Sequence, residues 1–304
     1  MNKNKVVIIG CGNVGMSYAY ALLNQTTSVK ELALIDLNTK RVDGEVMDLN
    51  HCLSLSPTKM KIKRGTYRDC NDADIIIIAA GVNQEKGETR LQLLKRNASI
   101  FKNIITKVMQ NHFKGIFLIA TNPVDIMTYL TKKYSGMPYN KVIGSGTSLD
   151  TSRLRYLIGN KLNIHPSCVH GYVIGEHGDS ELIAWSEINI GTQKVQDLLD
   201  EKTINKITND VRNAAYEIID KKGATYYGIG MCLVKITNAI LNNENSIMVV
   251  SSYDKEKNVY YGNPAILNKD GIRLRIKLTL AKEEKIKLKN SINVLLKSIN
   301  DIEK

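Results

Sequence analysis

The sequence predicts an α/β fold in which a doubly wound parallel sheet precedes a mixed α+β domain. In the first half of the chain, short β-branched runs alternate with amphipathic stretches, the pattern of repeated strand–helix units. The run IIIIAA at 75–80 is continuously apolar, as expected for a parallel strand covered by helices on both faces. After about residue 164 polar and apolar residues mix. Since 304 residues exceed the roughly 100–200 of a typical domain, we expect two domains, 1–144 and 145–304.

The expected elements follow one another along the chain. Each predicted strand of the first half precedes a predicted helix, giving strands at 6–9, 32–36, 75–80, 116–120 and 142–143 and helices at 13–24, 39–50, 88–111, 123–134 and 148–159. Beyond them we expect strand-like segments at 169–174 and 181–190, helices at 201–222 and 228–241, and a strand pair within 246–261. Apolar residues then recur at the spacing of a C-terminal helix, at Ile286, Ile292, Leu295, Leu296 and Ile299.

Composition favours a soluble, cytoplasmic protein. No apolar run approaches the roughly 20 residues that span a bilayer, and the N-terminus lacks the apolar core and cleavage site of a signal peptide. The five cysteines are scattered and include no C-x-x-C pair, which argues against a disulfide framework and against a zinc site. We therefore expect reduced thiols, no metal and no membrane partner.

The net charge of +12 raises the hypothesis of nucleic-acid binding, because basic surfaces attract phosphate backbones. The lysines, however, are spread over the whole chain, which favours solvated helix faces. We therefore expect no nucleic-acid partner. The surplus charge would instead steer small anions toward the protein.

A glycine motif follows the first predicted strand. In VVIIGCGNVG, Gly10, Gly12 and Gly15 have the spacing G-x-G-x-x-G. The first glycine permits a tight turn, the second lets the backbone approach a pyrophosphate, and the third lets the following helix pack closely. Asp36 ends the next predicted strand, where dinucleotide sites place a carboxylate on the ribose 2′-hydroxyl. This predicts NAD rather than NADP, since a carboxylate repels a 2′-phosphate; the alternative is a simple turn with Asp36 capping the next helix.

Asn13 and Val14 complete the predicted cofactor-binding loop, because they open the helix whose free N–H groups face the phosphates. The loop lacks the G-x-x-x-x-G-K-[ST] pattern of nucleoside-triphosphate sites. This argues against a kinase or an ATPase.

His177 is the candidate proton carrier. It lies in GYVIGEHGDSE between two glycines and after an apolar, strand-like run. A histidine titrates near neutral pH and works best when a carboxylate fixes its tautomer, a role for which Asp150 in GTSLDTSR is a candidate. The alternative is a structural histidine. The GDS at 178–180 lacks the G-x-S-x-G pattern of a serine hydrolase.

Two arginines and an asparagine are candidate substrate-binding residues. Arg90 ends the loop GVNQEKGETR, whose composition suggests a mobile lid after the strand at 75–80. Arg153 lies three residues after Asp150, and a guanidinium can grip a carboxylate with two hydrogen bonds or polarise a carbonyl. Asn122 follows a predicted buried strand, where its amide can reach a ligand or cap the next helix. The alternative for each arginine is a solvated surface side chain.

Several motifs together carry a resemblance to a known family. In order along the chain they are GCGNVG, LIDLN, AGVNQEKGETR, ATNPVDI, GSGTSLDTSRLR, GEHGDSE and KGATYYGIG. By these motifs the sequence resembles the lactate/malate dehydrogenase family over essentially its whole length, and within it the enzymes acting on L-lactate. The resemblance implies a Rossmann NAD domain, a substrate domain, and reversible hydride transfer between NADH and pyruvate giving L-lactate and NAD+.

The resemblance also assigns roles to the candidate residues. His177 is expected to be the acid/base held by Asp150. Arg153 is expected to bind the substrate carboxylate, and Arg90 to polarise the carbonyl from the closing loop.

Three further positions take roles from the same resemblance. Asn122 is expected to bind the substrate oxygen or the nicotinamide side. Thr225 is expected to line the pocket, and Ile229 to pack on the nicotinamide ring.

Gln84 is the expected specificity position. The matching position of the family's malate enzymes resembles an arginine, which would neutralise the second carboxylate of oxaloacetate. Burying an unpaired carboxylate is costly, so a neutral glutamine followed by Glu85 favours pyruvate, although Lys86 lies nearby. The alternative is a malate or other 2-hydroxy-acid dehydrogenase of the same fold.

Arg155 and His170 match positions that bind fructose 1,6-bisphosphate in the family's allosteric bacterial members. Both residue types suit phosphate, and the alternative is a surface arginine beside a strand histidine. The resemblance implies activation by this sugar phosphate and a homo-oligomer, expected to be a tetramer.

A rival from another class is a non-catalytic protein that senses dinucleotides or binds nucleic acid. The glycine loop and the positive charge motivate it. Such a protein has no use for Asp150, Arg153 and His177.

Overall fold

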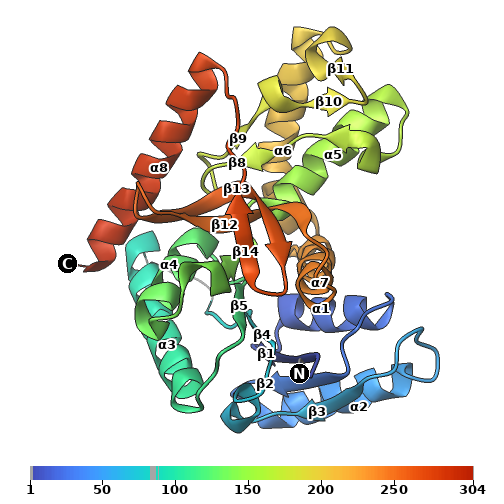
Figure 1. Cartoon of the computed structure of the whole chain (residues 1–304), viewed down its shortest axis with the longest axis vertical. Helices are drawn as coiled ribbons and strands as arrows, with labels where there is room; N and C mark the ends of the chain where they lie inside the picture. Colours follow the sequence, from blue (N-terminus) through green and yellow to red (C-terminus); the bar gives the residue numbers. More distant parts are fainter. Residues whose placement is uncertain (1–2, 83–86, 88, 304) are drawn as a thin grey trace.

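The computed structural model describes residues 3–82, 87 and 89–303 (Figure 1). The first half contains β1 (Lys5–Ile9), α1 (Asn13–Leu23), β2 (Glu31–Ile35), α2 (Thr39–Cys52), β3 (Lys61–Arg64), β4 (Ile75–Ile78), α3 (Arg90–Gln110), β5 (Ile116–Ile119), α4 (Val124–Ser135) and β6 (Val142–Gly144). The second half contains α5 (Ser148–Leu162), β7 (Val169–His170), β8 (Val173–Ile174), β9 (Leu182–Ile183), β10 (Asn189–Ile190), β11 (Gln193–Lys194), α6 (Glu201–Lys222), α7 (Tyr227–Leu241), β12 (Ser246–Asp254), β13 (Val259–Asn268), β14 (Gly271–Arg275) and α8 (Lys282–Glu303).

The predicted doubly wound sheet is confirmed. Strands β3-β2-β1-β4-β5-β6 are parallel neighbours in that order, and the order reverses direction at β1 and β4. Alternate side chains of β1 enter two cores: Val7 packs with residues of α3, α4 and α8, and Val6 with residues of α1, α2 and α7. In such sheets ligands bind at the carboxyl ends of the strands beside the reversal, which is where the glycine loop lies.

One predicted strand pair is wrong in extent, and the strands β3, β11 and β14 were missed. The pair expected within 246–261 is a three-stranded antiparallel unit, β12 to β14, which pairs with β6 and continues the main sheet to nine strands within the described part of the chain. Residues 61–64 form the edge strand β3, although KIKR has little apolar content. Strands from both sides of the expected boundary at 144/145 belong to this one sheet, since β6 pairs with β12. The division into two domains therefore stays a prediction.

The remaining elements form a smaller layer at the end of the molecule away from α2 and β3 (Figure 1). The strand-like segments expected at 169–174 and 181–190 are broken into two-residue strands, β7 to β10, with a 3₁₀ turn at Trp185–Glu187. Helices α5 and α6 pack on them around a separate core that includes Leu154, Val173 and Val211. Within the described residues, we find no helix with the length and apolarity needed to cross a membrane.

Candidate active site

The glycine loop between β1 and α1 has the geometry that its sequence predicts. Gly10 has φ +104°, and a Cβ there would lie 2.4 Å from the backbone nitrogen of Ala80. A Cβ on Gly15 would lie 2.1 Å from the carbonyl oxygen of Gly10. Gly12, in contrast, has nothing within 4 Å of its Cβ position. Two glycines therefore serve packing, and Gly12 keeps the surface open.

The N-terminus of α1 is available to an anion. Gly12 is its N-cap and supplies no side-chain cap, and the first turn carries no acidic residue. Asn13 is exposed, and Val14 packs at the edge of the core. The free N–H groups and the helix dipole thus favour negative charge at this position.

Asp36 and Gly12 both line a cavity of about 350 Å³. Oδ2 of Asp36 accepts the Cys11 N–H at 2.8 Å, so the carboxylate also holds the glycine loop. The alternative that Asp36 caps the next helix is wrong, because Asn38 is the N-cap of α2 and accepts the Arg41 N–H at 3.1 Å.

The fold brings His177 and Asp150 together from positions 27 residues apart. Asp150 lies in the first turn of α5 and is 2% exposed. His177 Nδ1 donates to Asp150 Oδ2 at 2.7 Å, and Arg153 donates to Asp150 Oδ1, also at 2.7 Å. No described residue binds His177 Nε2, so this atom can exchange a proton with a ligand.

Burial and nearby charge act on these groups in opposite directions. Burial alone would lower the pKa of His177, but Asp150, with smaller effects of Asp125 and Glu181, raises it to about 9. Burial likewise opposes ionisation of Asp150, yet His177 and Arg153 hold the pKa of Asp150 below its ordinary value. The pair is therefore an imidazolium beside a carboxylate at neutral pH.

The sequence analysis missed Asp125, which lies in the motif ATNPVDI. This residue of α4 is 2% exposed and accepts the His177 backbone N–H at 2.8 Å through Oδ2. Its Oδ1 accepts the hydroxyl of Ser251 in β12. Burial raises the pKa of Asp125 to about 6. One carboxyl thus joins α4, β12 and the loop that carries His177.

Glu181 is the second residue that the sequence analysis missed. It is 9% exposed, and one ligand atom each from Asp150, His177 and Glu181 lie within 4.8 Å of one another. Such a trio can hold a metal ion in principle. Here Arg153 already occupies one oxygen of Asp150, and its positive charge opposes a cation.

The other predicted residues lie on other elements of the fold. Asn122 is exposed between β5 and α4, and Thr225 lies between α6 and α7. Ile229 is in α7, which packs on α1 so closely that a Cβ on Gly230 would lie 2.9 Å from the backbone of Ser17.

Two predicted residues fall wholly or partly outside the described structure. Gln84 lies outside the described residues, as does the side chain of Arg90, whose backbone begins α3.

The two residues expected to bind the sugar phosphate are Arg155 in α5 and His170 in β7. Arg155 donates to the carbonyl oxygen of Gly171, at 3.4 Å from both Nε and Nη2. His170 is exposed.

Comparison with known proteins agrees with this architecture. Residues 4–144 match the family model described as lactate/malate dehydrogenase, NAD binding domain, and residues 147–304 match the model described as lactate/malate dehydrogenase, alpha/beta C-terminal domain. The chain belongs to the lactate/malate dehydrogenase family. Membership of the lactate/malate dehydrogenase family makes it an NAD-dependent oxidoreductase.

Similar proteins are known in several organisms. L-lactate dehydrogenase 1 of Bacillus cereus is 49% identical over 302 residues, covering 96% of each chain, and L-lactate dehydrogenase 2 of Bacillus anthracis is 50% identical over the same share. A solved lactate dehydrogenase from a Medee basin deep-sea metagenome library has TM-score 0.97 and 50% identity, covering 100% of both chains. The minor L-lactate dehydrogenase of Enterococcus mundtii, in its ligands-bound form, has TM-score 0.96 and 43% identity over 99% of this chain and 98% of that one.

Proposed function

We propose that the chain reduces pyruvate to L-lactate with NADH, and catalyses the reverse reaction. The observation that carries this proposal is the constellation of His177, Asp150 and Arg153: a fixed imidazolium beside a guanidinium, at the carboxyl edge of a dinucleotide-binding sheet. The names of curated relatives at 49% and 50% identity, which are L-lactate dehydrogenases, support it.

The residues present fit NAD. Gly12 leaves open space before the N-terminus of α1, which suits a pyrophosphate, and Asp36 borders the adjoining cavity, where it can accept ribose hydroxyls. Ile229 in α7 offers an apolar surface for the nicotinamide ring. When bound, NADH supplies the hydride.

The chain's own residues supply the proton and the binding charges. Arg153 grips the substrate carboxylate with guanidinium nitrogens that do not contact Asp150. His177 donates its Nε2 proton to the carbonyl oxygen of the substrate as negative charge develops there, while Asp150 stabilises the imidazolium before transfer. In the reverse direction neutral His177 takes the hydroxyl proton.

Four further residues complete the proposed site. Arg90 polarises the carbonyl when the loop before α3 closes. Asn122 binds the substrate oxygen or the nicotinamide side, and Thr225 lines the pocket. Gln84 is neutral and leaves the second carboxylate of oxaloacetate without a positive partner, so it favours pyruvate as the substrate.

Initial rates of NADH oxidation with pyruvate and with oxaloacetate test the proposal. We expect a strong preference for pyruvate and a shift toward oxaloacetate in Gln84→Arg. An oxaloacetate preference in the wild type would make the chain a malate dehydrogenase and refute the role of Gln84. Turnover of neither substrate would favour the non-catalytic alternative.

We also propose that fructose 1,6-bisphosphate activates the enzyme through Arg155 and His170. Arg155 is partly buried and has no carboxylate within ion-pair distance among the described residues. It donates to the carbonyl of Gly171, the residue directly after His170, so the two side chains come from neighbouring parts of the fold. Rates at low enzyme concentration, with and without the sugar, test this. The sugar should lower the pyruvate concentration at half-maximal rate in the wild type but not in Arg155→Gln.

The proposed enzyme is a cytoplasmic homotetramer. Exposed apolar residues on β12 and β14, Ile247 at 52% and Leu274 at 55%, support contact with another copy. Sedimentation velocity across protein concentrations would measure the assembly, and a monomer at all concentrations would refute it.

A further inference from the structure

The Glu181 carboxyl lies beside the catalytic pair. The Glu181 backbone N–H donates to Gly178 at 3.1 Å, which closes the turn that carries His177. Its carboxyl, however, makes no hydrogen bond or ion pair with any described residue, although the side chain is 9% exposed. A carboxyl buried among charges without a structural bond needs another explanation, because burying it is costly.

Glu181 lies against the catalytic pair and also lines a cavity. One ligand atom from each of Glu181, His177 and Asp150 lies within 4.8 Å of the others. The cavity has a volume of about 360 Å³ and lies between α6 and α8, where Arg212 and Lys287 also line it. A proton on Glu181 can therefore exchange with this cavity.

Charged and titratable groups from every neighbouring element act on this cluster. The loop that carries His177 contributes Glu176, Asp179 and Glu181, and the hydroxyl of Tyr216 in α6 donates to Asp179. The packed helices contribute Asp125 of α4, Asp150 and Arg153 of α5, Arg212 of α6, Cys232 of α7 and Lys287 of α8. Burial and Asp150 raise the pKa of Glu181, while His177, Arg153 and Arg212 oppose that rise. The ionisation of Glu181 is thus tied to the charge on His177, the group that must hold a proton for reduction.

We propose that Glu181 is a positioning residue for the proton of His177: a second carboxyl, beside Asp150, that keeps His177 protonated as the pH rises. The inference rests on the proposed reaction and deepens it. As the solution becomes alkaline, a negative charge on Glu181 stabilises the imidazolium and delays loss of its proton. At lower pH, the protonated acid carries no charge and does not repel the substrate carboxylate at Arg153. Glu181 would thereby widen the pH range of pyruvate reduction upward.

The substitution Glu181→Gln removes the charge and keeps the shape. We expect the pKa of His177, followed by NMR of ¹³C-labelled histidine, to fall by about one unit. The five histidines give few signals, and comparison with His177→Asn assigns the one that matters. The alkaline limb of kcat/KM for pyruvate should move down by the same amount, while rates at pH 6 stay within about twofold. Glu181→Asp, which retains the charge, should restore most of the shift.

Glu187→Gln is the matched control, because it is the same substitution six residues further along and Glu187 is not among the groups with the largest effects on the pKa of His177. It should leave both readouts unchanged. If Glu181→Gln does not fold, Glu181→Met removes the same charge without leaving a polar group buried. An unchanged His177 pKa in the folded variant would overturn the inference. Because this titration needs no substrate, it stays decisive even if the protein proves not to act on pyruvate.

Discussion

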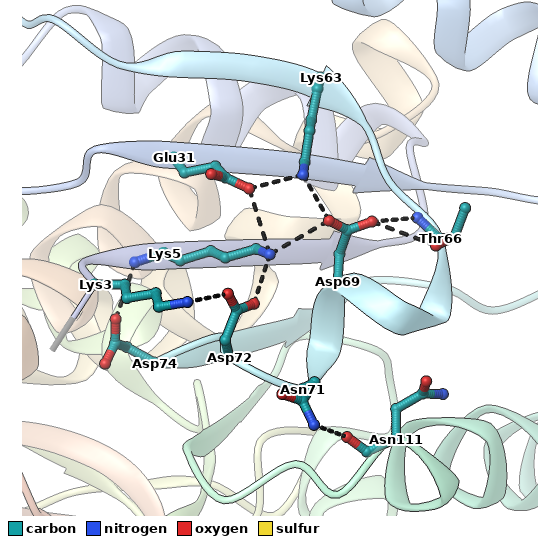
Figure 2. A network of polar contacts seen from close by, with 10 residues as sticks. All are labelled: Lys3, Lys5, Glu31, Lys63, Thr66, Asp69, Asn71, Asp72, Asp74 and Asn111. Carbon is teal, nitrogen blue, oxygen red and sulfur yellow. Dashed lines mark hydrogen bonds and ion pairs between the residues drawn. The ribbon is translucent and has the colours of Figure 1, made fainter. Parts of the chain in front are cut away.

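Two clusters of buried and half-buried charges lie at opposite edges of the parallel sheet, and they differ in how completely their charges are paired. At the amino edge, Lys5 of β1 lies 2.7 Å from Asp72 and 3.3 Å from both Asp69 and Glu31 (Figure 2). Lys63 bridges Glu31 and Asp69, at 2.9 and 2.7 Å. Each of these charges has an opposite charge in contact.

In the cluster at the carboxyl edge, several polar atoms of the described side chains make no hydrogen bond or ion pair with other described residues. His177 Nε2 and the Glu181 carboxyl have no partner among the described residues, and Arg153 uses only Nη1 in its bond to Asp150. A saturated cluster can stabilise the fold but cannot accept a ligand without breaking an ion pair. We therefore expect the cluster at the amino edge to stabilise the fold and the cluster at the carboxyl edge to bind and react with the substrate.

The largest effect on activity should come from Asp150→Asn. The variant keeps the volume but lets His177 lose its tautomer and its charge, so kcat/KM for pyruvate should fall about a thousandfold. Circular dichroism should show a folded protein. Activity within about tenfold of the wild type would mean that the pair is not the proton carrier.

Lys5→Met should instead act on stability. Removing one partner of a fully buried ion pair costs about 3–5 kcal/mol, but Lys5 is buried against carboxylates that are partly exposed, Asp72 to 34%, so we expect about 2 kcal/mol here. Lys3→Met is the matched control: Lys3 also contacts Asp72, but it is 63% exposed and should change the free energy of unfolding by less than about 0.5 kcal/mol. Urea denaturation measures both. Equal losses would contradict the difference drawn between buried and exposed pairs, and a large fall in kcat at 25 °C in Lys5→Met would contradict the division between the edges.

A smaller effect separates packing from binding within the glycine loop. Gly12 has φ −81° and free space at its Cβ position, so Gly12→Ala should fold normally yet weaken NADH binding about tenfold, because the methyl group occupies the approach of the pyrophosphate. Gly10→Ala should destabilise the apoprotein, because its φ is +104° and its Cβ meets Ala80. NADH fluorescence titration and thermal unfolding distinguish the two. Unchanged NADH affinity in Gly12→Ala would remove Gly12 from the site.

Local patterns in the sequence predicted the main sheet and part of the site. Continuous apolar runs identified the buried parallel strands, and the glycine spacing identified the turn before α1. The pattern failed where neighbours rather than local sequence decide: β3 is the polar KIKR, held at the edge by pairing with β2. The pairing of β14 with β13 likewise depends on the preceding hairpin.

The same limit applies to the site. The motifs suggested that Asp150 serves His177, but their contact follows from the packing of α5 on the loop. Asp125 and Glu181 lay in quoted motifs and were missed, since nothing in a local pattern says that a carboxyl will be buried beside His177. The roles of Gln84 and Arg90 stay predictions.

The pH dependence of the two reaction directions tests the central claim most directly, that His177 carries the proton. Reduction needs the protonated ring and oxidation the neutral one. Asp150 raises the pKa of His177 above its ordinary 6.5, so kcat/KM for pyruvate should fall, and kcat/KM for L-lactate should rise, with midpoints above pH 6.5. Midpoints at or below 6.5, or limbs of the same direction for both substrates, would contradict the account.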